Sequence, residues 1–162
     1  MENEAKDPME YRTERLQALQ EHLNLQNGDM KDVFDSQYED EGFTIGDEEY
    51  LVLTEKEADD RAREDIERSV WAFMPDFILS HCSTYENMSH WEYSAAKEAL
   101  DKIQAHFAEG INELVKAMIP DMDEFVDDAI CQDGRGHFIS HYDGKENEYK
   151  VNGKMFYVYR LN

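Results

Sequence analysis

An apolar stripe at helical spacing runs through the most highly charged part of this sequence of 162 residues. The stripe comprises Ala58, Ala62, Ile66, Val70, Phe73 and Phe77. Because these positions are three or four residues apart, they share one face of an α-helix, and the charged residues between them lie on the other faces. Thr54 and Glu57 have the spacing of a capping box. We therefore expect a helix that begins after Thr54 and ends or kinks after Met74, where Pro75 follows, with a second short helix up to Cys82.

Four other segments have helical patterns. Residues 8–25 form the first, and residues 29–41 are expected to form a short helix followed by an exposed acidic loop. Ser94 is expected to cap a long helix, in which Gly110 favours a bend. The apolar face of this helix comprises Ala96, Leu100, Ile103, Phe107, Ile111, Leu114 and Met118. Residues 120–133 form the last helix.

The β-prone segments are short and separated by turn dipeptides. Residues 43–45 and 50–53 flank Gly46-Asp47 and predict a hairpin. Near the C-terminus, residues 137–142, 146–151 and 154–161 alternate with Asp143-Gly144 and Asn152-Gly153, which favour tight turns between antiparallel strands. The expected fold class is α+β. It has a helical body of about four to six helices, a short hairpin in the N-terminal half and a C-terminal three-stranded antiparallel meander. We expect a single acidic domain over residues 1–162, with residues 1–133 mainly helical and 134–162 forming the meander.

Aromatic residues make up 12% of the chain, which is enough to contribute to a core. Those at helical spacing are expected to be core residues: Trp71, Phe73, Phe77, Trp91, Phe107 and Phe125. Tyrosines on the expected meander either pack as core or half-core residues or cover a partner surface; they are Tyr142, Tyr149, Tyr157 and Tyr159.

The chain carries 38 acidic residues against 16 Lys and Arg, so its formal net charge is -22. Residues 29–67 hold 16 acids and four bases, whereas residues 134–162 have a net charge of +2. This charge argues against direct binding of DNA, RNA or anionic lipid, which requires clustered cations. No apolar run has the roughly 20 residues of a membrane span, and Met1 to Glu4 lack the basic start of a signal peptide. We therefore expect a cytoplasmic protein.

The uneven charge predicts a binding surface for a positive partner. Seven acids lie between Thr54 and Glu67, a helical length of about 21 Å. This is one carboxylate per about 3 Å, comparable with one phosphate per roughly 3.4 Å along a DNA strand. The alternative is a solvated helix face with pairs such as Glu57–Arg61 and Asp59–Arg63. The predicted acidic surface comprises Glu39, Asp40, Glu41, Asp47, Glu48, Glu49, Glu55, Asp59, Asp60, Glu64, Asp65 and Glu67.

A second acidic set follows Pro120 and is a possible extension of the same surface. It comprises Asp121, Asp123, Glu124, Asp127 and Asp128. Its place at the start of a helix also agrees with the helix dipole, which favours negative side chains there. The alternating acids, central glycine and distant glutamate of a calcium loop are absent.

The sequence offers no pattern for a metal site or a nucleophile, so we expect no metal, no cofactor and no enzymatic activity. The histidines and the two cysteines lack the paired spacing of zinc ligands. Glycine-rich phosphate loops and the Gly-x-Ser-x-Gly motif are also absent. A hydrolase whose carboxylates are hidden among the other acids stays open as a third possibility.

Two blocks of the chain resemble uncharacterised small acidic proteins of phages and mobile elements. One block runs from Glu49 to Asp59 and continues at Ser69 to Phe73, and the other runs from Arg135 to Gly144. As a class, small and very acidic phage proteins are similar to anti-restriction and anti-CRISPR inhibitors, several of which imitate DNA. This resemblance is one of charge and size and transfers no residue roles.

The expected function is therefore that of a phage-encoded viral protein that occupies the nucleic-acid-binding surface of a host defence protein, by DNA mimicry. Its partner would be a host defence nuclease or effector complex in the host cytoplasm, reached without direct contact to nucleic acid or membrane. A homodimer stays open. Reversing the charge of Glu55, Asp59, Asp60 and Glu64 is expected to abolish binding and leave the fold intact. The alternative function is a structural, scaffold or assembly protein of a phage, with no catalytic activity.

Overall fold

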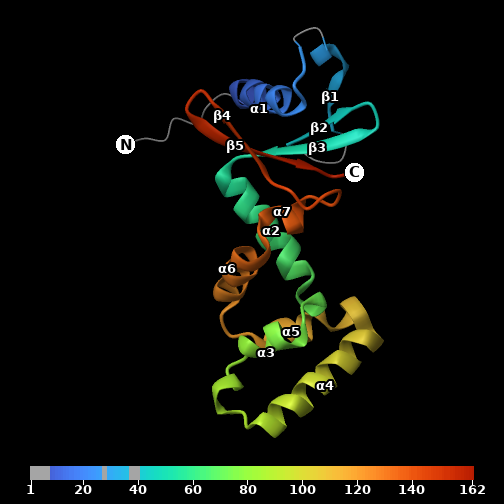
Figure 1. Cartoon of the computed structure of the whole chain (residues 1–162), viewed down its shortest axis with the longest axis vertical. Coiled ribbons are helices and arrows are strands. Elements are labelled where there is room, and N and C mark those ends of the chain that lie inside the picture. Colours follow the sequence, from blue (N-terminus) through green and yellow to red (C-terminus); the bar gives the residue numbers. More distant parts are fainter. Residues whose placement is uncertain (1–7, 27–28, 37–40) are drawn as a thin grey trace. The chain divides into compact units, whose positions relative to one another are not determined.

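The computed structural model describes residues 8–26, 29–36 and 41–162. These residues form an α+β fold with one five-stranded antiparallel sheet, which confirms the predicted fold class (Figure 1). The acidic residues Glu39 and Asp40 of the predicted surface lie outside the described residues.

The chain divides into two compact units. The first, which we call the sheet unit, comprises Met1–Ala62 and Asp133–Asn162, and the second, the helical unit, comprises Arg63–Gln132. The boundary falls within helix α2 (Glu55–Arg68). The prediction of a single domain over the whole chain stays a prediction.

The sheet unit is built around strands from both ends of the chain. Its strands are β1 (Val33–Asp35), β2 (Gly42–Ile45), β3 (Glu48–Leu53), β4 (Asn147–Val151) and β5 (Lys154–Arg160). The strand order is β1-β2-β3-β5-β4, with every neighbouring pair antiparallel. The predicted hairpin around Gly46 is confirmed as β2 and β3. The C-terminal hairpin β4–β5 continues the sheet because β5 pairs with β3.

Both faces of the sheet are covered. Helix α1 (Pro8–Leu23) lies on one face, where Ala18 and Leu19 pack against Val52 and Phe156 (Figure 1). Alternate residues of β3 and β5 point to the other face, which carries the N-terminal half of α2 and helix α7 (Arg135–Ile139). This double cover explains why the central strands are almost continuously buried.

Two local predictions in the sheet unit are wrong. Residues 137–142 were expected to form the first strand of a meander, but Arg135–Ile139 is helix α7, and only a two-stranded hairpin follows. The helix buries Gly136 and Ile139, three residues apart, on one face. Where a short helix was expected after residue 29, the structure has the 3₁₀ turn η1 (Asp29–Asp32) followed by edge strand β1. The acidic loop expected next falls largely on residues 37–40, which lie outside the described residues.

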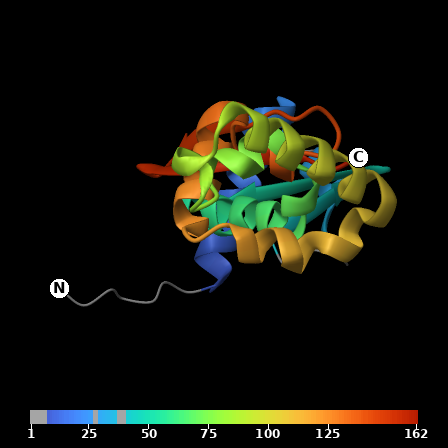
Figure 2. The ribbon, with the colours of Figure 1, turned by 90° about the horizontal axis from the view of Figure 1, so that it is seen from below.

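The helical unit contains short helices joined by 3₁₀ turns. After α2 come η2 (Val70–Ala72), α3 (Pro75–Ser80), η3 (Tyr85–Asn87), α4 (His90–Phe107), η4 (Ala108–Ile111), α5 (Asn112–Met118) and α6 (Met122–Asp133). The chain turns sharply between α4 and α5, as the yellow and orange segments of Figure 2 show. Ala108 has a φ of 46°, which ends α4 two residues before Gly110, close to the predicted bend.

Helix α2 ends at Arg68, earlier than the predicted Met74. Two side-chain amides bind the backbone where the helix gives way to η2. Asn112 accepts a hydrogen bond from the Trp71 N–H at 3.0 Å and donates to the Glu67 carbonyl at 2.9 Å. Gln104 donates to the Trp71 and Phe73 carbonyls at 2.6 and 2.8 Å. These distant amides satisfy the groups that a continuing helix would have bonded itself.

The apolar stripe is largely confirmed, but four other core predictions are wrong. Ala58, Ala62, Ile66 and Val70 are fully buried. The four exposed side chains, with their exposed fractions, are Trp91 (81%), Phe107 (57%), Leu114 (57%) and Met118 (37%). The predicted cap Ser94 is also wrong, because Ser89 caps α4 in a capping box with Glu92. The helix therefore begins earlier and presents Trp91 to solvent in its first turn.

The tyrosines of the C-terminal segment divide between core and surface. Tyr157 and Tyr159 are buried, which confirms the core interpretation for these two. Tyr149 is half-buried, and Tyr142 is 57% exposed, with Arg160 over its ring at 3.7 Å.

His22 on α1 gives the sheet unit a pH-dependent contact. Its Nδ1 atom lies 3.1 Å from the Tyr149 hydroxyl, and its ring meets Tyr50 and Tyr149 edge-on. Burial lowers the pKa of His22, and the negative charge of Asp143 offsets only part of this effect. The folded protein therefore binds fewer protons than the unfolded chain just below pH ~6.5, the ordinary pKa of histidine.

We expect the free energy of unfolding to fall as the pH drops below ~6.5, and His22→Gln to reduce this slope. The measurement is the urea midpoint of both proteins from neutral to mildly acidic pH. His106→Gln, at an exposed histidine of α4, is the matched control. Identical pH slopes for wild type and His22→Gln would show that His22 does not contribute.

Candidate acidic interface

The strongest contacts of the predicted acidic surface are made by Glu55 and Asp59 in the sheet unit. Both accept hydrogen bonds from Arg135 Nη1, at 3.1 and 2.8 Å. The Arg135 side chain is only 10% exposed. Glu55 and Asp59 therefore hold a buried cation of their own chain, and we no longer expect their reversal to leave the fold intact.

Arg135 is the centre of a larger polar cluster below the sheet. Its Nε and Nη2 atoms bind the two carboxylate oxygens of Glu146 at 2.9 Å each. Its guanidinium carbon lies 4.3 Å from the centroid of the Tyr157 ring. Tyr157 donates its hydroxyl hydrogen to Glu55, and Tyr159 donates to Glu146. We call these six side chains the Arg135 cluster: Arg135, Glu55, Asp59, Glu146, Tyr157 and Tyr159.

The electrostatics of the Arg135 cluster favour the charged form of Arg135 and the neutral forms of its two phenols. Burial alone would lower the pKa of Arg135, but hydrogen bonds to Glu146 and its other neighbours raise it. Burial, reinforced by the hydrogen bond to Glu146, raises the pKa of Tyr159. The hydrogen bond to Glu55 raises the pKa of Tyr157. This cluster therefore ties the start of α2 to α7 and β5, and it has a structural role.

Another acid of α2 is also held internally. Glu57 accepts hydrogen bonds from the Thr54 N–H at 2.7 Å and from Arg15 Nη2 at 2.7 Å. The first confirms that Glu57 reaches back to the cap as predicted. Burial would raise the pKa of Glu57, but these hydrogen bonds lower it. Arg15 also donates to the Val52 carbonyl, so the contact joins α1, β3 and α2.

Most other members of the predicted surface pair with nearby cations. In the sheet unit, Glu48 pairs with Arg160, and Asp60 pairs with Lys56 on the next turn of α2. Glu49 accepts a hydrogen bond from the Ser36 hydroxyl. Among the described residues, no ion pair involves Glu41 or Asp47.

In the helical unit, the α2 acids are paired in the same way. Glu64 and Asp65 lie 3.8 and 3.5 Å from Arg68, and Glu67 lies 3.2 Å from Arg63. The alternative interpretation, a solvated helix face with ion pairs along it, therefore describes this end of α2 well. The Glu64–Arg68 pair is exposed on both sides and contributes little to stability.

Helix α6 presents the least interrupted acidic face in the helical unit. Its sequence contains no Lys or Arg. Phe125, Val126 and Ala129 face the core, so Asp123, Glu124, Asp127 and Asp128 lie on the exposed side. We call these four residues the α6 acidic face. Asp121 precedes it and accepts a hydrogen bond from the Glu124 N–H at 3.0 Å, which places this acid at the start of the helix as the dipole favours.

Two of the four carboxylates in the α6 acidic face have cationic or histidine neighbours. Asp123 lies 2.7 Å from Arg63, and Asp128 lies 3.2 Å from His81 Nε2. Glu124 and Asp127 take part in no ion pair within the described parts of the chain. The set that sequence analysis treated as an extension is thus more open to a partner than the predicted centre on α2.

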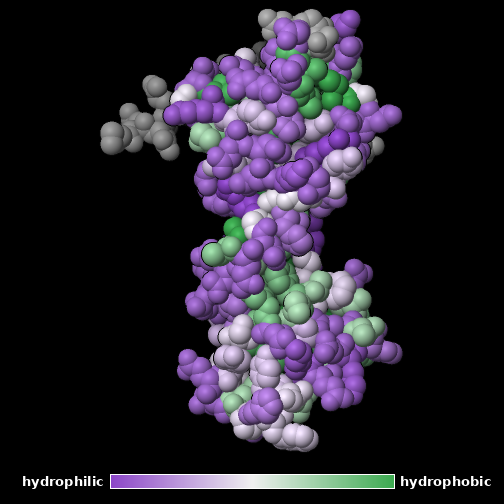
Figure 3. All heavy atoms as spheres, in the orientation of Figure 1, coloured by the Kyte–Doolittle hydropathy of each residue, from purple (hydrophilic) through white to green (hydrophobic). Residues whose placement is uncertain are grey.

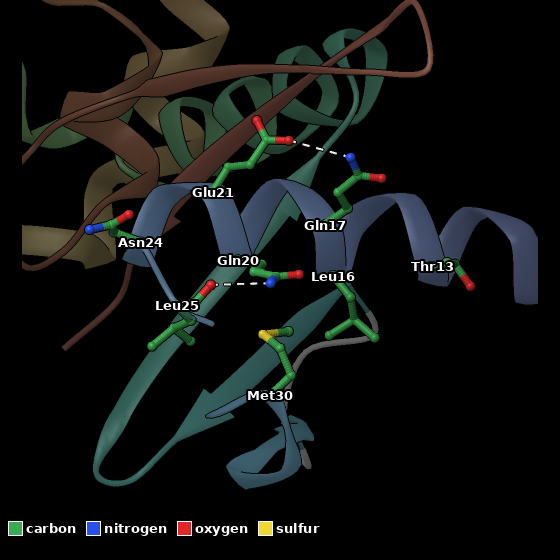
Figure 4. A pocket seen from close by; sticks show the side chains of 8 residues that line it. All are labelled: Thr13, Leu16, Gln17, Gln20, Glu21, Asn24, Leu25 and Met30. Atoms are coloured by element: carbon green, nitrogen blue, oxygen red, sulfur yellow. Dashed lines mark hydrogen bonds between the residues drawn. The ribbon is translucent and has the colours of Figure 1, made fainter. Parts of the chain in front are cut away.

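The surface also has a polar hollow over α1, with a volume of about 700 Å³ (Figure 4). Gln17, Gln20 and Asn24 of the α1 segment line it, together with Leu16 and Met30. Gln17 donates to Glu21 at 3.4 Å, and Gln20 donates to the Leu25 carbonyl at 3.1 Å. Because the Gln17 and Gln20 amides already have partners within the chain, the hollow presents no converging set of groups for a ligand.

The described residues contain no group of three or more His, Cys, Asp or Glu that is placed to hold a metal ion. Both cysteines are free, with Cys82 buried and Cys131 exposed. No helix in the described parts of the chain is long and apolar enough to cross a membrane. Comparison with protein-family models, with curated proteins and with solved structures found no match.

Proposed function

We propose that this protein is a non-catalytic acidic inhibitor that occupies the nucleic-acid-binding surface of another protein, with carboxylates in the place of phosphates. The observation that carries the proposal is the α6 acidic face, four exposed carboxylates on a helix without Lys or Arg. A partner with clustered Lys and Arg would complement this face and would be attracted to it over a distance.

The spacing of the α6 acidic face suits this role. From Asp123 to Asp128 the helix axis rises by about 7.5 Å. Successive phosphates on one strand of B-DNA are roughly 3.4 Å apart along the axis, so about 7.5 Å of DNA covers two phosphate steps. Asp123 already pairs with Arg63 at 2.7 Å. The three carboxylates that remain match the roughly three phosphates that bound two such steps, so a few cations of the partner would bind them.

The charge of the whole helical unit agrees with the proposal. It contains 15 acidic residues and five Lys or Arg, a net charge of -10. Each of the five cations, Arg63, Arg68, Lys97, Lys102 and Lys116, lies in an ion pair with an acid of this unit. The remaining negative charge is thus available to a positive partner. The target class that we propose, a host defence nuclease or effector complex, rests on the likeness in charge and size to small acidic phage proteins.

We expect Glu124→Gln combined with Asp127→Asn to weaken target binding by about tenfold at low salt. The reason is that two exposed charge contacts of up to about 1 kcal/mol each are lost. The matched control is Asp32→Asn combined with Glu148→Gln, which removes the same charge from exposed positions of the sheet unit outside both predicted acidic sets. The measurement is retention of bacterial lysate proteins on the immobilised full chain at low and high salt, followed by elution with double-stranded DNA.

The proposal requires that a retained protein binds nucleic acid and is eluted from the resin by DNA or by high salt. It also requires that the Glu124→Gln/Asp127→Asn variant retains less of this protein than the control variant does. Equal retention by both variants would exclude the α6 acidic face as the mimic. The structural or assembly role would instead be favoured if light scattering shows a large symmetric oligomer and DNA elutes no retained protein from the resin.

A further inference from the structure

An apolar hollow of about 240 Å³ opens between α3, α4 and α5 of the helical unit. Its floor includes Leu79, Leu100 and Val115, which are buried. Its rim includes Leu114 and Met118, which are 57% and 37% exposed and lie one helical turn apart on α5. In Figure 3 the surface is mostly hydrophilic, with some hydrophobic patches coloured green. We call this hollow the α4–α5 groove.

The α4–α5 groove is large and apolar enough to take apolar side chains. An apolar cavity of only about 150 Å³ in another protein remains free of water and binds benzene. The lining here is almost entirely hydrocarbon and thioether, including Met88 and Met118, and methionine adapts its shape to different apolar partners. Filling the groove would remove apolar surface from water, which favours binding of an apolar side chain.

The chain around the groove is negative. Residues 84–118, which provide most of its lining, contain six acids and three lysines. Lys97 pairs with Asp76, Lys102 with Glu98, and Lys116 with Glu67 and Glu113. The exposed acids that remain are Glu86, Glu92, Asp101 and Glu109. A partner that covers the groove therefore gains most if it is positively charged at its edges.

We propose that the α4–α5 groove binds an amphipathic helix of a partner protein, with apolar side chains in the groove and Lys or Arg along the flanks. An apolar groove between two helices with acidic surroundings matches the way such helices bind, through apolar anchors three or four residues apart. One or two anchors in a well-packed pocket supply most of the binding energy, and the basic flanks set specificity. This inference does not depend on mimicry by the α6 acidic face.

The test uses the full-length protein and a helical model peptide of about four turns, composed only of Lys and Leu at amphipathic spacing. Ala99→Phe fills the groove from its exposed rim on α4. Ala95→Phe adds the same ring to an exposed position of α4 outside the groove and is the matched control. Leu114→Ser, on the opposite wall, is a second variant in case Ala99→Phe perturbs the fold. Circular dichroism and thermal unfolding establish that each variant is folded.

We expect Ala99→Phe and Leu114→Ser to weaken peptide binding by about tenfold, which corresponds to about 1.4 kcal/mol, while Ala95→Phe binds as wild type does. In a Cys131→Ser background, the peptide should also slow modification of Cys82, a thiol that lines the groove. Equal affinity of the Ala99→Phe and Ala95→Phe variants would overturn the proposal. So would equal binding of a peptide with Glu in place of Lys. If the wild-type protein is a dimer and Ala99→Phe makes it a monomer, the groove binds a second copy of the chain instead of a partner helix.

Discussion

Replacing Arg135 by Met is expected to lower the free energy of unfolding by about 3 kcal/mol. The guanidinium is 10% exposed and binds both oxygens of Glu146, whose side chain is only 22% exposed. Removing one partner of a buried ion pair leaves the other charge without compensation, and this costs about 3–5 kcal/mol. We take the lower end because the other partners, Glu55 and Asp59, are more than half exposed and regain water. Urea unfolding measures the change.

Arg12 provides a control with similar geometry at an exposed position of the same unit. Its Nε atom lies 3.0 and 3.2 Å from the two oxygens of Asp35, but the two side chains are 46% and 61% exposed. Exposed pairs contribute less than about 1 kcal/mol, so Arg12→Met should have a small effect. Equal losses for Arg12→Met and Arg135→Met would contradict the argument that burial makes the Arg135 cluster important.

The double variant Arg135→Met with Glu146→Gln separates the loss of a contact from the cost of an unpaired charge. If the stranded Glu146 carboxylate is the main cost, its neutralisation should restore part of the stability lost by Arg135→Met alone. If the double variant instead loses as much stability as the two single variants together, the two residues act independently. The ion pair is then not the cause of the loss in Arg135→Met.

Local patterns predicted the elements whose environment is set by nearby residues. Ala58, Ala62 and Ile66 are buried because a helix with its apolar residues on one face has only one favourable orientation. The hairpin of β2 and β3 follows from two short β-prone runs on either side of Gly46, which has a φ of 59° in the turn.

Elements that depend on distant residues were not predictable in this way. The end of α2 is determined by the side chains of Gln104 and Asn112, more than 30 residues away in the sequence. Residues 137–142 have the composition of a strand, but β4 is an edge strand of the described sheet, and helix α7 instead buries Gly136 and Ile139 on one face. Trp91 lies in a capped first turn that no other element covers, so its aromatic character alone predicted the wrong environment.

The same limit applies to the candidate site. A count of acids identifies dense segments, but it does not show which carboxylates already bind a cation of the chain. Glu55 is separated from Arg135 by 80 residues, so their contact has no local signature. On α6 the absence of Lys and Arg was visible in the sequence, and it is a better indicator of an open acidic face than the density of acids.

Gly136→Ala is expected to destabilise the protein by about 3 kcal/mol, the upper end of the range for overpacking. A Cβ atom at Gly136 would lie 2.6 Å from the Gly144 carbonyl oxygen and 2.7 Å from the backbone of Lys145 and Glu146. Backbone atoms cannot rotate away as a side chain does, so the whole 144–146 segment would have to move. Gly110→Ala is the control, because nothing lies within 4 Å of its Cβ position. We expect that change to be neutral or to stabilise by about 0.5 kcal/mol.

Because Glu146 is part of the segment that Gly136→Ala would displace, the variant should also weaken the Arg135 cluster. The two substitutions then act on the same contacts, and their effects should not be additive. The double variant Arg135→Met with Gly136→Ala should lose clearly less stability than the two single variants together, as measured by urea unfolding. Full additivity would mean that the close approach at Gly136 positions the backbone independently of the Arg135–Glu146 pair. A non-additive result would explain why this segment folds as a short helix: Gly136 allows the backbone contact that brings Glu146 to Arg135.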